Sequence, residues 1–187
     1  MQKSYRDFLG APIRDRFTRG LVGQVSGFVI NPANGEIVAF FAHRNHKLLL
    51  PTTDILRVAT GVVWIENTEA FAAVDEIVRI HDIIKINIPI FGSKVFTVSR
   101  QYLGEVVNFQ FETNGWVLTK LDVAKKILTI STERKLINSS QIVRIKPTEI
   151  TVRDAVVRVR AKKANNAIAP DLANAAFAEP LKNTNQQ

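Results

Sequence analysis

The densest group of side chains that could do chemistry is the segment from His43 to Lys47. His43 and His46 lie three residues apart there, with Arg44 between them. Histidine nitrogens are common zinc ligands, but the segment offers no third ligand and its cations would repel a metal ion. A solvated basic loop is the favoured interpretation, and contact with a phosphate or an acidic partner is the alternative. The sequence therefore predicts no metal site.

A second basic group lies near the N-terminus, where aromatic residues separate arginines. It consists of Arg6, Arg14, Arg16 and Arg19, with Tyr5 and Phe17 among them. Such a segment could follow a phosphate backbone and stack bases on its rings. The favoured alternative is that Phe17 packs in the core while the arginines are solvated. The candidate macromolecule-binding residues are therefore Arg14, Arg16, Arg19, His43, Arg44, His46 and Lys47.

No group of residues in the sequence supports hydrolysis or group transfer. The chain has no cysteine, its serines lie outside any nucleophile-elbow motif, and it has no glycine-rich phosphate loop. Glu36 and Asp54 are separate carboxylates in expected turns, and we interpret them as turn and capping residues. We therefore expect a non-enzymatic protein that uses no metal and no cofactor.

The candidate residues are positioned by a β unit that the sequence contains twice. Residues 21–30, closed by Asn34-Gly35, recur as residues 102–111, closed by Asn114-Gly115. The corresponding glycines are Gly10 and Gly92 (92 − 10 = 82), Gly23 and Gly104 (104 − 23 = 81), and Gly35 and Gly115 (115 − 35 = 80). Residues 50–58 likewise correspond to 137–145, at the larger offset 142 − 55 = 87. Four blocks in the same order indicate an internal duplication.

Local patterns divide the chain into four parts. We expect a first β unit over residues 1–72, a linker over 73–88, a second β unit over 89–160 and a flexible basic tail over 161–187. Apolar residues at three- and four-residue spacings predict a short linker helix over 75–84. The tail is predicted because Ala, Asn, Pro and Gln dominate it.

The turns and the core of these units can also be predicted. Asn114-Gly115 between two apolar strands predicts a tight hairpin with the glycine at positive φ. Units of this size bury only about 60% of their unfolded surface, so we expect the copies to support each other or a partner. The aromatic residues expected in the core are Phe40, Phe41, Trp64, Phe109, Phe111 and Trp116. Any of them that is exposed would mark a partner interface.

The repeated pattern resembles the PRC-barrel family. The residues that carry the resemblance are Leu9 to Ile13, Gly23 to Ile30 and Gly35 in the first copy, and Phe91 to Val95, Gly104 to Phe111 and Gly115 in the second. The closing strand is similar at Leu50 to Val58 and at Ile137 to Ile145, where Asn138 replaces the family's proline. The resemblance covers about residues 9–65 and 91–157.

The resemblance implies an all-β fold of two tandem small PRC-type β-barrels, joined here by the linker helix and followed by the disordered tail. Members of the family include the cytoplasmic part of a photosynthetic reaction-centre subunit and a domain of a bacterial ribosome-maturation factor. The family implies a non-catalytic adaptor that binds other macromolecules and carries no catalytic residues.

Charge and hydropathy set limits on the partner. The net charge of +8 is compatible with nucleic acid, anionic lipid or an acidic protein. No early segment has the apolar core of a signal peptide, and no run approaches the roughly 20 apolar residues of a spanning helix, so we expect a cytoplasmic protein.

The leading expectation is an adaptor or scaffold that binds another protein through its barrel surfaces. The sequence is also compatible with a homo-oligomer. The alternative is an RNA-associated factor in ribosome maturation or rRNA processing. One continuous basic face would favour RNA, whereas scattered charges around an apolar patch would favour a protein.

Overall fold

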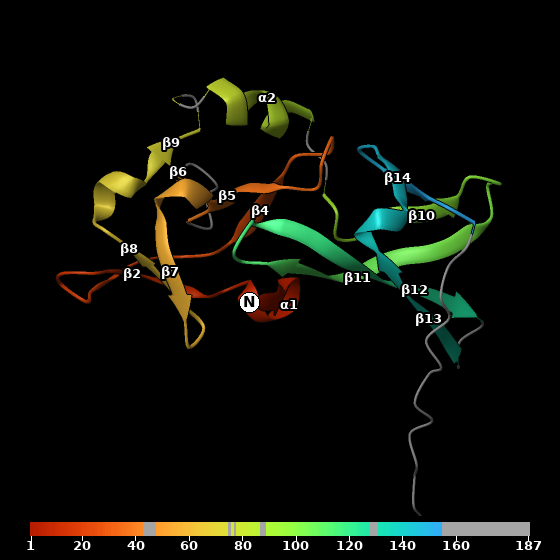
Figure 1. The fold of residues 1–187 in the computed structure, drawn as a ribbon, viewed down its shortest axis with the longest axis horizontal. Coiled ribbons are helices and arrows are strands. Elements are labelled where there is room, and N and C mark those ends of the chain that lie inside the picture. The colour runs from red at the N-terminus through yellow and green to blue at the C-terminus, as the bar shows by residue number, and fades with distance from the viewer. Residues whose placement is uncertain (43–47, 75, 77, 87–88, 128–130, 155–187) are drawn as a thin grey trace, which may run out of the picture.

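The computed structural model describes residues 1–154 except 43–47, 75, 77, 87–88 and 128–130. This part of the chain is all-β, with three sheets and a few short helices (Figure 1). No helix in the described ranges is both long enough and apolar enough to cross a membrane. The predicted tail and the basic loop residues His43, Arg44, His46 and Lys47 lie outside the described residues.

The first copy forms two four-stranded sheets. One has the order β3-β2-β8-β7 and contains β2 (Pro12–Asp15), β3 (Leu21–Gln24), β7 (Ile55–Ala59) and β8 (Val62–Ile65). The other has the order β4-β5-β6-β9 and contains β4 (Gly27–Ile30), β5 (Ile37–Phe41), β6 (Leu48–Pro51) and β9 (Ala72–Ala73).

The second copy forms a single sheet in the order β13-β12-β11-β10-β15-β14. Its strands are β10 (Lys94–Thr97), β11 (Tyr102–Glu112), β12 (Val117–Ile127), β13 (Ser131–Asn138), β14 (Ile142–Ile145) and β15 (Glu149–Val152). The N-terminal strand β1 (Gln2–Ser4) pairs with β11, and the short helix α1 (Tyr5–Phe8) follows it. Helix α2 (Val78–Ile86) connects the copies, shifted slightly from the predicted 75–84.

The two copies share part of their strand pairing, as an internal duplication would require. In each copy the first strand, β2 or β10, pairs antiparallel with the next strand and parallel with the last, β8 or β15. The turn after that first strand also repeats a hydrogen bond: Arg16 N donates to Ile65 O, and Val98 N to Val152 O, both at 2.9 Å. None of the sheets seen in the described residues closes on itself, so closed barrels are not shown.

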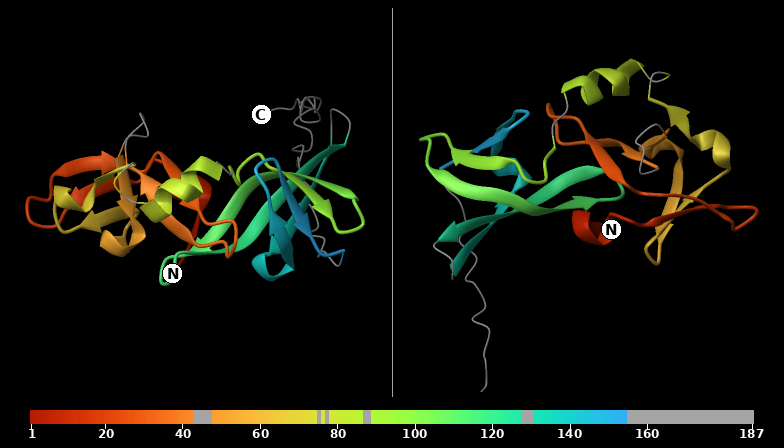
Figure 2. Two further views of the ribbon diagram at one scale, coloured as in Figure 1. Left: turned by 90° about the horizontal axis from the view of Figure 1, so that it is seen from above. Right: turned by 180° about the vertical axis from the view of Figure 1, so that it is seen from behind.

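The copies lie side by side (Figure 2), and their central hairpins contact each other reciprocally, as around an approximate two-fold axis. Ile37 N donates to Trp116 O at 2.6 Å, Leu118 N donates to Gly35 O at 2.9 Å, and Glu36 and Val117 form the bridge between them. Residues 35 and 116, 36 and 117, and 37 and 118 are related by one offset (117 − 36 = 81). A reciprocal contact between equivalent positions is what two-fold symmetry requires.

One hydrophobic core extends through both copies. Phe28 and Phe109, which the same offset relates (109 − 28 = 81), meet edge to face with ring centroids 5.5 Å apart. Phe8 of α1 is 1% exposed and contacts rings from both copies, those of Phe28, Phe40, Phe111 and Trp116. The copies therefore support each other, as expected for units too small to bury a large core alone.

The hairpin of the second copy corrects one prediction. Gly35 has φ 74, but in the second copy the positive φ belongs to Trp116 (φ 50) and not to Gly115. Trp116 keeps this unusual conformation because its carbonyl accepts from Ile37 N and its ring packs on Phe40 and Phe111. The structural counterpart of Gly35 is therefore Trp116.

Candidate macromolecule-binding face

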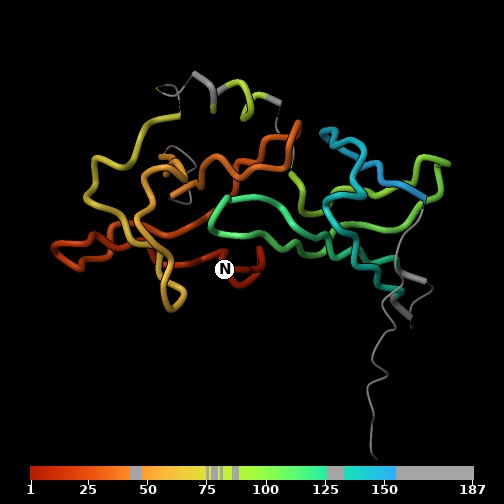
Figure 3. The backbone as a smooth tube through the Cα atoms, viewed as in Figure 1, coloured from red at the N-terminus to blue at the C-terminus, as the bar shows by residue number. Residues whose placement is uncertain are grey.

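The candidate arginines near the N-terminus lie on β2 and in the turn after it. Arg14 lies on the opposite side of β2 from the fully buried Ile13, because successive strand residues face opposite ways. Arg16 and Arg19 are exposed in the turn. The connection between β2 and β3 forms one end of the molecule, and the equivalent connection between β10 and β11 forms the other (Figure 3).

The buried side chain of Asp15 fixes this turn. Its carboxylate accepts hydrogen bonds from Thr18 N at 2.9 Å and Phe17 N at 2.7 Å. These bonds, that of Thr18 foremost, outweigh burial and lower the pKa of Asp15. Arg14 Nη1 donates to the carbonyl of Arg19 at 2.7 Å, and Arg19 takes a positive φ of 56°. The backbone of the turn that carries Phe17 and Arg19 is therefore fixed by these hydrogen bonds.

The structure shows that the prediction of a core position for Phe17 is wrong. Its side chain is 70% exposed, and the guanidinium of Arg16 lies 5.7 Å from the ring centroid. Arg16 also forms an ion pair with Glu66 at 3.4 Å. The turn held by Asp15 places Phe17 away from the sheet. An exposed aromatic side chain beside arginines is typical of an interaction surface.

A row of side chains crosses the outer face of the same sheet. The strand register places Leu21, Arg14, Trp64 and Arg57 opposite one another on β3, β2, β8 and β7. Residues directly opposite share one face, here the face away from Val63 and Ile65, which are fully buried. The guanidinium of Arg57 lies 5.4 Å from the centroid of the Trp64 ring, within cation–π range.

This surface is named the arginine face; it comprises the row Leu21, Arg14, Trp64 and Arg57, the adjoining Val62, and turn residues 16–19. It combines cations with exposed apolar area, since Leu21 is 64% exposed. Glu66 pairs with Arg16, but within the described ranges Arg14, Arg19 and Arg57 have no carboxylate within ion-pair distance. Its charges are thus scattered around an apolar strip.

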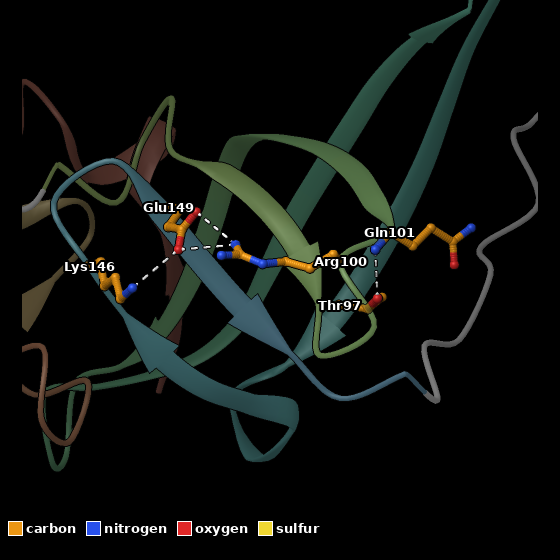
Figure 4. A network of polar contacts seen from close by, with 5 residues as sticks. All are labelled: Thr97, Arg100, Gln101, Lys146 and Glu149. Atoms are coloured by element: carbon orange, nitrogen blue, oxygen red, sulfur yellow. Dashed lines mark hydrogen bonds and ion pairs between the residues drawn. The ribbon is translucent and has the colours of Figure 1, made fainter.

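The equivalent face of the second copy is built differently. Its row consists of Tyr102, Phe96, Thr151 and Arg144, so an aromatic residue replaces Arg14 and a threonine replaces Trp64. The turn arginine of this copy, Arg100, pairs with Glu149 at 3.3 Å (Figure 4). The combination of an outward tryptophan with a turn arginine, Arg19, that has no ion pair in the described residues therefore distinguishes the first copy.

Sequence reasoning identified only part of this face. Arg14, Arg16 and Arg19 belong to it, whereas the candidates of the basic loop lie outside the described residues. Trp64 was predicted in the core and is instead partly exposed under Arg57; Phe41 is also partly exposed, while Phe40, Phe109 and Phe111 are buried. Strand alternation puts Trp64 on the same face as Val62 and opposite Val63 and Ile65, but all four residues are apolar, so the local sequence does not say which face is buried.

An apolar cavity of about 250 Å³ lies between β4, α2 and residues 89–91; among the described residues that line it, Tyr5 is titratable, and burial raises its pKa. In the part of the chain that the structure describes, no group of three or more His, Asp or Glu side chains is placed to hold a metal ion. Comparison of the chain with protein-family models and with curated proteins finds no match.

Proposed function

We propose that the chain is a non-enzymatic adaptor, built from two PRC-type β units, that binds an acidic surface of another protein through the arginine face. The observation that carries the proposal is the row in which Arg57 stacks on the outward-facing Trp64 beside Arg14. Arginine and tryptophan are enriched at the energetic centres of protein interfaces. Three arginines without an acidic partner in the described residues complement carboxylates.

The distribution of charge favours a protein over a nucleic acid. The exposed apolar side chains Phe17 and Leu21 lie among the arginines, and Glu66 adds a negative charge beside Arg16. A surface that follows a phosphate backbone carries a continuous run of cations. Mixed apolar and charged character is typical of a surface that binds protein.

The second candidate is an RNA-associated factor in ribosome maturation or rRNA processing. It is supported by the net charge of +8 and by the exposed Phe17 and partly exposed Trp64, on which bases could stack. Binding of this kind would lose affinity steeply with added salt, because it releases counterions from the phosphates.

The test compares a labelled peptide that alternates glutamate with leucine with a structured RNA, each titrated with the full-length protein across a salt series by fluorescence anisotropy. We expect the peptide to bind, and Arg57→Gln to weaken it about tenfold, the scale of a moderate interface contact. Arg144→Gln, at the equivalent position of the second copy, is the control and should leave the affinity unchanged.

Two results would overturn the proposal. Tight RNA binding with a steep salt dependence, without peptide binding, would establish the second candidate instead. Equal losses in Arg57→Gln and Arg144→Gln would mean that attraction depends on total charge and not on the arginine face.

A further inference from the structure

The second copy contains a carboxylate that bridges two cations on its outer face. Glu149 of β15 pairs with Arg100 at 3.3 Å and with Lys146 at 3.4 Å (Figure 4). Arg100 reaches it from the turn between β10 and β11, where its backbone has φ 65. The arginine at this turn is therefore directed back over the sheet toward the first residue of β15.

The first copy has a similar backbone framework at this place, although its turn is one residue longer: Asp15 N donates to Gly20 O, whereas Thr97 N donates to Gln101 O. Arg19 corresponds to Arg100: both have positive φ, and the amide of each donates at 3.0 Å to a carbonyl of the preceding strand, that of Asp15 or Thr97. Ile13 pairs with Val63 as Val95 pairs with Ile150. The residue before Val63, Val62, therefore takes the place of Glu149 (149 − 62 = 87).

The first copy therefore lacks the carboxylate at this place but retains the turn arginine, Arg19. Val62 cannot neutralise Arg19, and Ala59 replaces Lys146 at the same offset (146 − 59 = 87). Arg14 adds a second cation beside Arg19, since its guanidinium donates to the carbonyl of Arg19 at 2.7 Å. Arg14 takes the position that Phe96 has in the second copy.

We propose that Arg19 and Arg14 form a carboxylate-binding site above Val62, where an aspartate or glutamate side chain of the partner takes the place that Glu149 has in the second copy. The inference rests on the proposed function and deepens it by naming the group that is recognised. Charge-assisted hydrogen bonds to a guanidinium favour a carboxylate of defined position.

The neighbours of this site define the rest of the partner's motif. Trp64 lies opposite Arg14 in the register, and Leu21 lies on its other side. An apolar side chain next to the partner's acidic residue would contact these two surfaces. The expected ligand is therefore a peptide in which a glutamate or aspartate is flanked by an apolar residue, and not an acidic run alone.

Adding a carboxylate to the chain at position 62 tests the site directly. Val62→Glu supplies the missing carboxylate in the chain itself, and we expect it to weaken binding of the glutamate–leucine peptide at least about tenfold. Val62→Gln is nearly the same shape without the charge, and it should stay within about twofold of the wild-type affinity. Far-UV circular dichroism of both variants checks that the sheet is intact.

Removing the carboxylate of Glu149 from the second copy gives an independent test. Glu149→Gln frees Arg100 and Lys146, so isothermal titration should show a second, weaker peptide site per chain. If Val62→Glu and Val62→Gln bind alike and Glu149→Gln adds no site, the carboxylate site is overturned while the adaptor function stands. If the wild-type protein does not bind the peptide even at low salt, the proposed function itself fails.

Discussion

At the scale of single residues, two glycines of the repeat lie where the neighbouring backbone leaves little room for a side chain. Gly104 lies on β11 with φ 131, and a Cβ built on it would be 2.3 Å from the carbonyl oxygen of Ala124 on the paired strand. At the equivalent Gly23 a Cβ would lie 3.2 Å from the carbonyl oxygen of Ala42. Both copies thus use a glycine where the neighbouring backbone approaches closely.

Gly104→Ala is therefore expected to destabilise the protein by about 2–4 kcal/mol, since it adds backbone strain and a steric clash. Gly115→Ala is the control, because a Cβ there meets nothing within 4 Å and its φ is not in the left-handed region. We expect that variant to change the free energy of unfolding by less than about 0.5 kcal/mol. Urea unfolding measures both, and equal losses would contradict the structure.

The repeat in the sequence paired Gly23 with Gly104, whereas Phe17 and Trp64 were wrongly expected in the core. A glycine that recurs at the same place in two copies signals a backbone requirement even without a structure. Phe17 and Trp64 gave no such signal, because an isolated aromatic residue can pack inside or outside a sheet. Which side it takes depends on the turn held by Asp15 and on the register of β2 and β8, and neither is specified by local sequence.

At the scale of elements, the turn between β2 and β3 is the segment through which the fold positions part of the arginine face. It presents Phe17 and Arg19, and its conformation depends on the hydrogen bonds that the Asp15 carboxylate accepts. The equivalent turn uses the hydroxyl of Thr97, which accepts from Gln101 N at 3.1 Å (Figure 4). Both turns therefore depend on an ionised carboxylate, because Asp154 accepts hydrogen bonds from Ser99 N at 3.2 Å and from Ser99 Oγ at 2.7 Å in the second turn.

The stability of the first turn should depend on pH. The pKa of Asp15 is lowered in the folded state, so its contribution to stability is complete above the ordinary pKa and is lost as pH falls through the folded-state value. Asp15→Asn should therefore be less stable than wild type near pH ~7, and the difference should shrink toward pH ~3.

Urea midpoints of the two proteins across this pH range provide the measurement. Asp154, whose pKa is lowered by hydrogen bonds from Ser99, also affects acid stability. The relevant quantity is therefore the difference between wild type and Asp15→Asn at each pH. A difference that stays constant with pH would mean that the ionised form of Asp15 does not hold the turn.

At the scale of the molecule, the duplication makes one body from two small units. The hairpin tips exchange hydrogen bonds around the approximate two-fold axis, and Phe28 and Phe109 meet beside them. The sequence predicted the two copies from block order, and from their size it predicted that they support each other or a partner. Their sheets and shared core depend on contacts between distant residues, such as β1 with β11, for which the local pattern gives no signal.

Because the core is continuous, we expect both copies to unfold together. The chain has two tryptophans, and they report on different places: Trp64 on the outer face of the first copy and Trp116 on the contact between copies. Trp116→Phe leaves the first reporter and Trp64→Phe the second. In each variant, the fluorescence midpoint in urea should coincide with the midpoint of its own far-UV circular dichroism.

Replacing a core residue where the two copies meet tests their coupling directly. Phe28→Ala removes a ring that contacts Phe8, Phe40, Phe109 and Phe111, so it should lower both midpoints together, by the equivalent of about 3–5 kcal/mol. If the two copies unfolded independently, Phe28→Ala would shift the midpoint of Trp64 fluorescence, while circular dichroism would retain a second transition at the wild-type midpoint. A single shifted transition means that the arginine face is presented by a platform whose stability both copies share.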